Sequence, residues 1–258
     1  MKQSIDISQL SRISREAGAA ILDVYGTEFS VDVKEDKSPL TEADKRSNEV
    51  IVSALAARYP EIPVISEETR EVPYRERKDW RRFWLVDPLD GTKEFIKRNG
   101  EFTVNIALVE DGAPVAGFVY QPVGDRLYWG IAGEGAWLSV EGRDPIALEG
   151  GDHYSGKGKV TVVASRSHLT PEVESFVSRL RDEGKEVEFL SAGSSLKICL
   201  VAEGAADVYP RLGPTMEWDT GAAHAVAVAA GRRVVSAETG DPLVYNKESL
   251  LNPFFIVE

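Results

Sequence analysis

The stretch Trp84-Leu85-Val86-Asp87-Pro88-Leu89-Asp90-Gly91-Thr92 joins an apolar run directly to two carboxylates. The apolar residues predict a buried strand, and Pro88 predicts a turn that brings Asp90 back beside Asp87. Gly91 permits a tight backbone, after which Thr92 is expected to begin a short helix whose free N–H groups can hold a phosphate. Taken alone, the same residues also fit a β-turn with Asp90 at a turn position.

Acidic residues also end or begin three other predicted elements. Glu67 and its neighbour follow a short apolar strand, Asp219 stands where a helix N-cap is expected, and Asp44 follows Thr41 at the spacing of a capping box. Each fragment alone also fits a solvated surface or an ordinary cap. Together with the central stretch they predict a site for Mg²⁺, which prefers oxygen ligands. The carbonyl oxygen of Leu89, between the two aspartates, is a further candidate ligand.

The pattern of elements predicts an α/β protein, an α+β layered arrangement with a mixed sheet and flanking helices in two packed halves. Helices are expected over residues 7–24, 41–59, 171–183, 195–203 and 219–230, and strands over 29–34, 63–66, 83–86, 103–109, 114–121, 126–132, 159–164, 188–190 and 207–209. A glycine-rich stretch at 150–158 is the candidate boundary. It divides residues 1–150, which carry the main acidic loops, from residues 151–258, which contribute Asp219 and substrate contacts.

Composition excludes several classes of protein. The 258 residues are 43% hydrophobic and 28% charged, which is typical of a globular chain. A net charge of −12 argues against binding a nucleic-acid polymer. Cys199 is the only cysteine, which suits a reducing cytoplasm. The most apolar run, residues 221–231, is shorter than the roughly 20 residues that span a bilayer, so no transmembrane segment is expected.

These motifs together resemble the signature of the inositol monophosphatase superfamily of Mg²⁺-dependent, lithium-sensitive phosphatases. The resemblance rests on Glu67-Glu68, Asp87-Pro88-Leu89-Asp90-Gly91-Thr92 and Trp218-Asp219. Within the superfamily the chain is most similar to the bacterial 3'(2'),5'-bisphosphate nucleotidases of the CysQ type. Three stretches favour that branch: Lys93-Glu94-Phe95-Ile96, Gly193-Ser194-Ser195-Leu196-Lys197 and Tyr209-Pro210-Arg211.

The resemblance implies an αβαβα sugar-phosphatase-like fold, two or three Mg²⁺ ions and a set of roles. Glu67, Asp87 and the Leu89 carbonyl would hold the first ion, and Asp87, Asp90 and Asp219 the second. Thr92 and Asp44 would act as a relay that positions water and accepts its proton, with Glu67 also counted as catalytic. The substrate contacts implied are Glu67, Leu89, Asp90, Gly91, Thr92, Gly193, Ser194, Ser195, Lys197, Arg211 and Asp219.

The reaction implied is hydrolysis of the 3'-phosphate of adenosine 3',5'-bisphosphate to AMP and phosphate. The sulfated relative, 3'-phosphoadenylyl sulfate, is a second candidate substrate, and the reaction would recycle a by-product of sulfate assimilation. The partner is then a small phosphorylated nucleotide. A monomer and a homodimer are both compatible with the sequence. The expected compartment is the cytoplasm, with peripheral association at the inner membrane left open.

Three alternatives remain at this stage. An inositol-1-monophosphatase would share the metals and the mechanism and differ in its pocket. A haloacid-dehalogenase-like phosphatase would need an Asp-x-Asp-Gly-Thr motif, whereas the spacing here is one residue longer. A non-catalytic phosphonucleotide-binding regulator would keep the fold without turnover. Separated histidines make zinc improbable; His168 is a candidate phosphate contact, and His224 is expected in packing.

Overall fold

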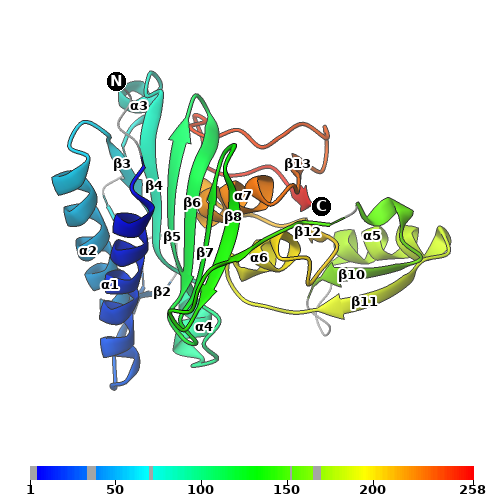
Figure 1. Ribbon diagram of the computed structural model, residues 1–258, viewed down its shortest axis with the longest axis horizontal. Coiled ribbons are helices and arrows are strands. Elements are labelled where there is room, and N and C mark those ends of the chain that lie inside the picture. Colours follow the sequence, from blue (N-terminus) through cyan, green and yellow to red (C-terminus); the bar gives the residue numbers. More distant parts are fainter. Residues whose placement is uncertain (1–4, 34–38, 70–71, 152, 165–169) are drawn as a thin grey trace.

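The computed structural model describes residues 5–33, 39–69, 72–151, 153–164 and 170–258, and these form a layered α/β protein (Figure 1). The helices are α1 (Ile7–Tyr25), α2 (Glu42–Arg58), α3 (Tyr74–Arg77), α4 (Thr92–Ile96), α5 (Pro171–Asp182), α6 (Leu196–Ala202) and α7 (Glu217–Ala229), with a 3₁₀ turn at Tyr154–Gly156. The strands are β1 (Val31–Val33), β2 (Pro39–Thr41), β3 (Val64–Ser66), β4 (Arg82–Asp90), β5 (Thr103–Glu110), β6 (Ala113–Gln121), β7 (Arg126–Ile131), β8 (Gly135–Val140), β9 (Ile146–Ala147), β10 (Lys159–Val163), β11 (Glu186–Leu190), β12 (Tyr209–Arg211), β13 (Val234–Ser236) and β14 (Phe255–Val257). The predicted fold class is confirmed.

The central layer is a seven-stranded mixed sheet in the order β3-β4-β5-β6-β7-β8-β9. β3 runs parallel to β4, and every later neighbour in this sheet is antiparallel. The predicted meander of β5, β6 and β7 is confirmed, and the sheet continues into β8 and β9, which the sequence analysis missed. Because β3 and β4 are parallel, the residues that follow both strands meet at one edge of the sheet.

Helices α1 and α2 cover one face of this sheet (Figure 1). In α1 the side chains of Leu10, Ile13, Ala17 and Ile21 are fully buried at helical spacing, as predicted. Thr41 caps α2 and forms the expected capping box with Asp44. These contacts fix the first turn of α2 against the end of the central sheet.

Helices α6 and α7 cover the other face, and α7 lies unusually close to the strands (Figure 1). A Cβ added at Gly117 of β6 would lie only 2.0 Å from the carbonyl oxygen of Ala222 in α7. Glycine on the strand and alanines on the helix therefore allow a contact that larger side chains would prevent. The close packing explains why the apolar run at residues 221–231 is rich in alanine. It also sets the distance between the sheet and Asp219, which lies in the first turn of α7.

The remaining layers lie beyond α6 and α7. β10 and β11 form a parallel pair that packs with α5, and β12, β14 and β13 form a three-stranded antiparallel sheet (Figure 1). The strand predicted at 207–209 was placed too early: β12 covers Tyr209–Arg211, because its partner β14 pairs with those residues. Strands β13 and β14 were not predicted.

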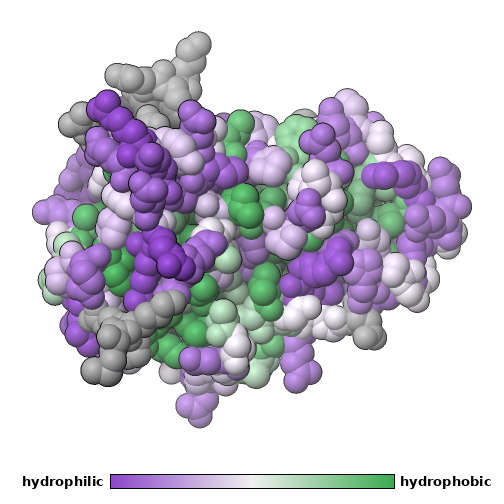
Figure 2. Space-filling model, turned by 90° about the horizontal axis from the view of Figure 1, so that it is seen from above, coloured by the Kyte–Doolittle hydropathy of each residue, from purple (hydrophilic) through white to green (hydrophobic). Residues whose placement is uncertain are grey.

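The molecular surface is mixed in character. On the face shown in Figure 2, hydrophilic residues lie between patches of hydrophobic ones. Of the helices that the structure describes, none combines the length and apolar character that a membrane-spanning segment requires.

Candidate active site

The end of β4 brings the first carboxylates to the edge of the central sheet. The strand does not end at Asp87, as the sequence suggested; it continues to Asp90, and its register with β5 shifts between these two residues. The turn predicted at Pro88 is therefore a bulge-like irregularity within the strand. Gly91 then adopts φ 90° and ψ 41°, a left-handed conformation that suits glycine, and α4 begins at Thr92 as expected.

Acids from four separate parts of the chain surround one pocket at this edge. The carboxylate pocket, of about 270 Å³, is lined by Glu67, Asp87, Leu89, Asp90, Gly91, Thr92, Lys93, Glu94 and Asp219. Glu67, Asp87 and Asp219 each offer an oxygen, and these three oxygens lie within 4.8 Å of one another. Asp90 lines the pocket but stands outside this group of three. The structure thus brings together all the residues that the sequence proposed as metal ligands.

Asp219 reaches the pocket from a position that differs from the prediction. Helix α7 begins two residues earlier, at Glu217 with Met216 as N-cap, so Asp219 lies in the first turn instead of at the cap. Its Oδ2 accepts a hydrogen bond from the backbone N–H of Met216 at 2.8 Å. A carboxylate in the first turn both satisfies a free N–H and interacts favourably with the helix dipole.

The clustered charges repel one another strongly. Burial raises the pKa of Asp87 well above its usual range, and the carboxylates of Glu67, Asp90 and Asp219 raise it further. Burial and Asp90 also raise the pKa of Asp219 to about 8, against the hydrogen bond from Met216. A cation among these oxygens would reverse the repulsion.

The donor set fits a hard divalent cation. The acidic side chains around the carboxylate pocket offer only oxygen, and Asp87 is almost fully buried, with 1% of its surface exposed. Its Oδ1 accepts the backbone N–H of Leu89 at 3.1 Å, which orients the carboxylate. Oxygen-only donors from few carboxylates, with room left for water and phosphate, match the coordination that Mg²⁺ takes in proteins.

Thr92 and Asp44 form a hydrogen-bonded pair beside the same pocket. The Thr92 hydroxyl lies 3.2 Å from Asp44 Oδ1 and 3.4 Å from the Leu89 carbonyl oxygen. The other carboxylate oxygen, Oδ2, accepts the backbone N–H and the hydroxyl of Thr41, at 2.7 and 2.6 Å. Asp44 therefore caps α2 with one oxygen and faces Thr92 with the other, as the sequence analysis suggested.

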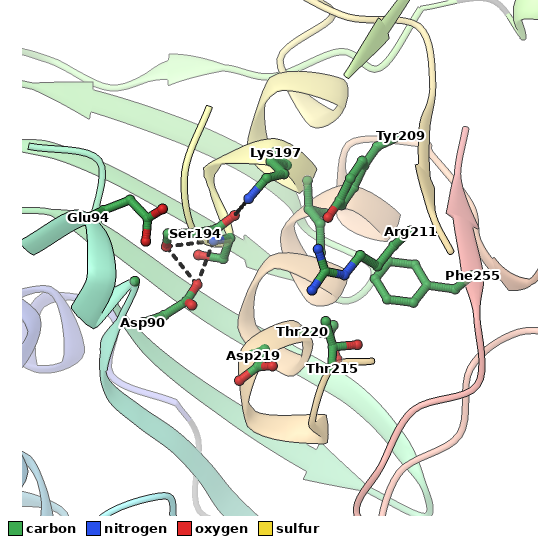
Figure 3. A pocket seen from close by; sticks show the side chains of 13 residues that line it. Asp90, Glu94, Ser194, Lys197, Tyr209, Arg211, Thr215, Asp219, Thr220 and Phe255 are labelled. Carbon is green, nitrogen blue, oxygen red and sulfur yellow. Dashed lines mark hydrogen bonds between the residues drawn. The ribbon is translucent and has the colours of Figure 1, made fainter. Parts of the chain in front are cut away.

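A second pocket, of about 230 Å³, adjoins the first across Asp90 and Asp219 (Figure 3). We call it the Lys–Arg pocket, since Lys197 and Arg211 project into it. Its lining is Asp90, Gly91, Glu94, Ser194, Ser195, Lys197, Ile198, Tyr209, Arg211, Thr215, Asp219, Thr220 and Phe255. Gly193, also predicted as a substrate contact, is buried directly before this lining.

The two cations of this pocket have unused hydrogen-bonding capacity. Within the described chain, Nε of Arg211 is buried and has no hydrogen-bond partner. The ammonium of Lys197 donates to the Ser194 carbonyl at 3.1 Å, and burial lowers its pKa although Asp90 acts in the opposite direction. Two half-buried cations that line one cavity are suited to an anion.

A third cavity continues from the Lys–Arg pocket and is mostly apolar. It has a volume of about 190 Å³ and shares Lys197, Tyr209 and Arg211 with its neighbour. Its other lining residues are Val163, Ala164, Thr170, Val173, Pro210, Leu212 and Gly213. His168, the predicted phosphate contact, lies outside the described residues. The three pockets thus run from carboxylates through cations to an apolar wall.

The structure adds polar residues that the sequence analysis did not single out. Thr103 and Asn105 on β5 are buried beside the site and bond to Ser194, Ser195 and Asp90. The available signal was two polar residues at alternate positions of an otherwise apolar strand. His224 is buried in α7, as predicted, and its Nδ1 lies 2.9 Å from the Tyr245 hydroxyl.

A layered fold with carboxylates gathered at the end of parallel neighbouring strands places the chain in the class of sugar-phosphatase-like proteins. The chain belongs to the inositol monophosphatase family, which it matches over residues 3–253. It is 46% identical to the 3'(2'),5'-bisphosphate nucleotidase CysQ of Escherichia coli K12 over 256 residues, which are 97% of this chain and 98% of that protein. It is 38% identical to the protein of that name from Buchnera aphidicola, over 94% of this chain and 88% of that protein. The crystal structure of CysQ from Bacteroides thetaiotaomicron superimposes with a TM-score of 0.85 at 47% identity, and covers 97% of this chain and 96% of that one.

Proposed function

We propose that this chain is a Mg²⁺-dependent 3'(2'),5'-bisphosphate nucleotidase that hydrolyses the 3'-phosphate of adenosine 3',5'-bisphosphate to AMP and phosphate. The observation that carries the proposal is the adjacency of the carboxylate pocket and the Lys–Arg pocket, which share Asp90 and Asp219. One site suits a cation that binds the reacting phosphate, and the other suits a second anion. The names of the CysQ relatives support the same substrate.

The three pockets match the parts of such a nucleotide. The 3'-phosphate would occupy the carboxylate pocket, with Glu67, Asp87, Asp90, Asp219 and the Leu89 carbonyl holding two or three Mg²⁺ ions. The 5'-phosphate would bind Lys197 and Arg211, and the base would lie against the apolar wall of the third cavity. An inositol monophosphate has no second phosphate or base, so it would leave the Lys–Arg pocket and the apolar cavity unused.

The chemistry is hydrolysis by in-line attack of water on phosphorus. Bound Mg²⁺ supplies charge stabilisation of the phosphate oxygens and a lowered pKa for coordinated water. The Thr92 hydroxyl accepts a hydrogen bond from the attacking water while donating to Asp44 Oδ1. The water proton can then pass through the hydroxyl to Asp44 as the P–O bond to C3' breaks and the ribose oxygen takes a proton from solvent.

Further parts of the proposal follow from the resemblance and the relatives. 3'-Phosphoadenylyl sulfate is a second substrate candidate, because its modified 5' end would also face the Lys–Arg pocket. The reaction would recycle a by-product of sulfate assimilation in the cytoplasm. The chain would divide near residue 150 into two halves. It would act as a monomer or as a homodimer.

The first experiment is phosphate release from adenosine 3',5'-bisphosphate and from inositol 1-phosphate, each with Mg²⁺ and with chelator. We expect release that requires Mg²⁺ and prefers the nucleotide. An Asp87→Asn variant should fold, because it removes one of four clustered negative charges, and should lose turnover. Asp111→Asn, which removes an exposed carboxylate paired with Arg81, is the control. Preference for the inositol ester would overturn the substrate, and normal turnover by Asp87→Asn would overturn the mechanism.

A further inference from the structure

Strand β5 carries two buried polar residues directly opposite the acids of β4. Asn105 pairs across the sheet with Asp87, and Thr103 pairs with Asp90. Neither side chain is more than 1% exposed. Buried polar groups are costly unless they are hydrogen-bonded, and an apolar residue would serve the core at either position equally well. Their polarity therefore needs an explanation outside core packing.

The hydrogen bonds of these two residues converge on one oxygen of Asp90. Asp90 Oδ2 lies 2.6 Å from the Ser194 hydroxyl, 2.5 Å from the Ser195 backbone nitrogen and 3.4 Å from Asn105 Nδ2 (Figure 3 shows the contact with Ser194). The Thr103 hydroxyl in turn lies 2.5 Å from the Ser194 hydroxyl and 2.8 Å from that of Ser195. The Ser195 hydroxyl donates to Asn105 Oδ1 at 2.9 Å.

The directions of these bonds can be assigned by counting protons. Asn105 Oδ1 accepts from Ser195, so its amide nitrogen must face Asp90, which fixes the side-chain flip. The Ser194 hydroxyl gives its only proton to Asp90, so Thr103 must donate to Ser194. Three donors therefore point at Oδ2 of Asp90: the Ser194 hydroxyl, the Ser195 backbone N–H and Asn105 Nδ2. Thr103 supports the first of them by donating to Ser194, and the Ser195 hydroxyl supports the third by donating to Asn105 Oδ1.

Saturation of Oδ2 leaves the other oxygen for a cation. Among the described residues, Oδ1 of Asp90 accepts no hydrogen bond, whereas Oδ2 has three donors. A carboxylate with one oxygen fixed by donors presents the other in a single orientation. Ser194 contributes to this arrangement in a left-handed backbone conformation with φ 55°, which a non-glycine residue adopts only where its surroundings enforce it.

We propose that Thr103 and Asn105 are positioning residues that hold Asp90, through Ser194 and Ser195, so that its Oδ1 faces Mg²⁺. The proposal rests on the metal site of the proposed function and adds residues to which no role has been given. It also accounts for the place of Asp90 beside the group formed by Glu67, Asp87 and Asp219, since only Oδ2 of its carboxylate is held toward residues 194–195. Ser194 and Ser195, which line the Lys–Arg pocket, therefore also orient a metal ligand in the neighbouring carboxylate pocket.

A matched pair of variants tests the positioning role. Thr103→Val deletes the hydroxyl and keeps the shape, whereas Thr103→Ser keeps the hydroxyl and deletes a methyl group. Both changes lie in the core and should lower Tm. The quantity measured is the affinity of the full chain for Mn²⁺ in the absence of substrate. The electron paramagnetic resonance signal of free Mn²⁺ reports how much of the ion is unbound. Mn²⁺ is used because it takes the same oxygen ligands as Mg²⁺. We expect Thr103→Val to bind Mn²⁺ about 10- to 100-fold more weakly, and Thr103→Ser to bind it like the parent chain.

A purely structural role predicts a different pattern. Thr103→Val would then have a lower Tm and unchanged Mn²⁺ affinity, and this result would overturn the proposal. Asn105→Leu, which also frees Asp90, provides a second test should Thr103→Val not fold, and it should weaken Mn²⁺ binding in the same way. Ser139→Ala, which removes a buried hydroxyl of β8 that donates to the backbone carbonyl of Arg143, controls for general destabilisation. Because Mn²⁺ binding is measured without turnover, failure of the nucleotidase assay and failure of this proposal remain distinguishable.

Discussion

Replacing Arg211 by methionine should separate recognition of the second phosphate from the chemistry at the first. Methionine keeps the unbranched length of the side chain and removes the guanidinium, whose Nε is buried and lacks a partner within the described chain. Arg211 Nη2 donates to the Pro214 carbonyl at 2.9 Å, so the side chain is already oriented before substrate arrives. Little conformational entropy should then be lost when a phosphate binds.

The expected magnitude follows from the bonds lost. A hydrogen bond to a charged group contributes about 1.5–3 kcal/mol, which corresponds to a roughly 10- to 150-fold decrease in kcat/KM. This decrease should occur for adenosine 3',5'-bisphosphate and be absent for 3'-AMP, which lacks the 5'-phosphate. Arg211→Lys should lie between the two, because it keeps the charge and loses the planar set of donors.

The assay is phosphate release from both nucleotides by the parent chain and the two variants at saturating Mg²⁺. A change in folding or in the carboxylate pocket would lower kcat/KM equally for both nucleotides. Only a loss confined to adenosine 3',5'-bisphosphate therefore reports on the second phosphate. Equal losses for both substrates would show that Arg211 serves the reacting phosphate or the fold, and not the second phosphate. Unchanged kinetics with both would show that the second phosphate binds elsewhere.

Three further outcomes follow from individual contacts. Thr92→Val should lower kcat by about 100- to 10,000-fold and leave Mn²⁺ affinity unchanged, because it removes the hydroxyl of the proton relay and no carboxylate; a parent-like kcat would contradict this. Glu217→Gln should cost about 3–5 kcal/mol and lower Tm by roughly 10 °C in a thermal melt, because the fully buried carboxylate pairs with Lys247 at 2.5 Å; a loss below about 1 kcal/mol would contradict it. Burial lowers the pKa of His224 to about 4, against about 6.5 when unfolded, so its contribution is complete above pH 6.5 and is lost as the pH falls toward 4. Urea titrations should show about 2 kcal/mol of this loss by about pH 5 in the parent chain and none of it in His224→Leu, and parallel pH profiles would contradict the assignment.

Much of the local structure could be predicted because its causes are local. The spacing of Leu10, Ile13, Ala17 and Ile21 is enough to define the buried face of α1, and Thr41 with Asp44 is enough to define a capping box. The acids that follow β3 and that end β4 were recognised because a buried strand that ends in carboxylates is an unusual pattern. The short strands β9, β13 and β14 carry too few residues for a pattern, so only their partners define them.

The phosphatase motif, the family resemblance and the candidate metal ligands can all be recognised in the sequence alone. Tertiary structure decided how these residues meet: Asp219 arrives from a helix that packs against Gly117, and Lys197 and Arg211 arrive from the C-terminal layers beside Asp90. It also decided that Thr103 and Asn105 bond toward Asp90, since cross-strand register is a property of two strands and of neither alone. The physical reason is common to all three cases. A motif fixes the chemistry of a short segment, whereas distances between distant segments depend on sheet order, helix packing and the small side chains that let the layers approach.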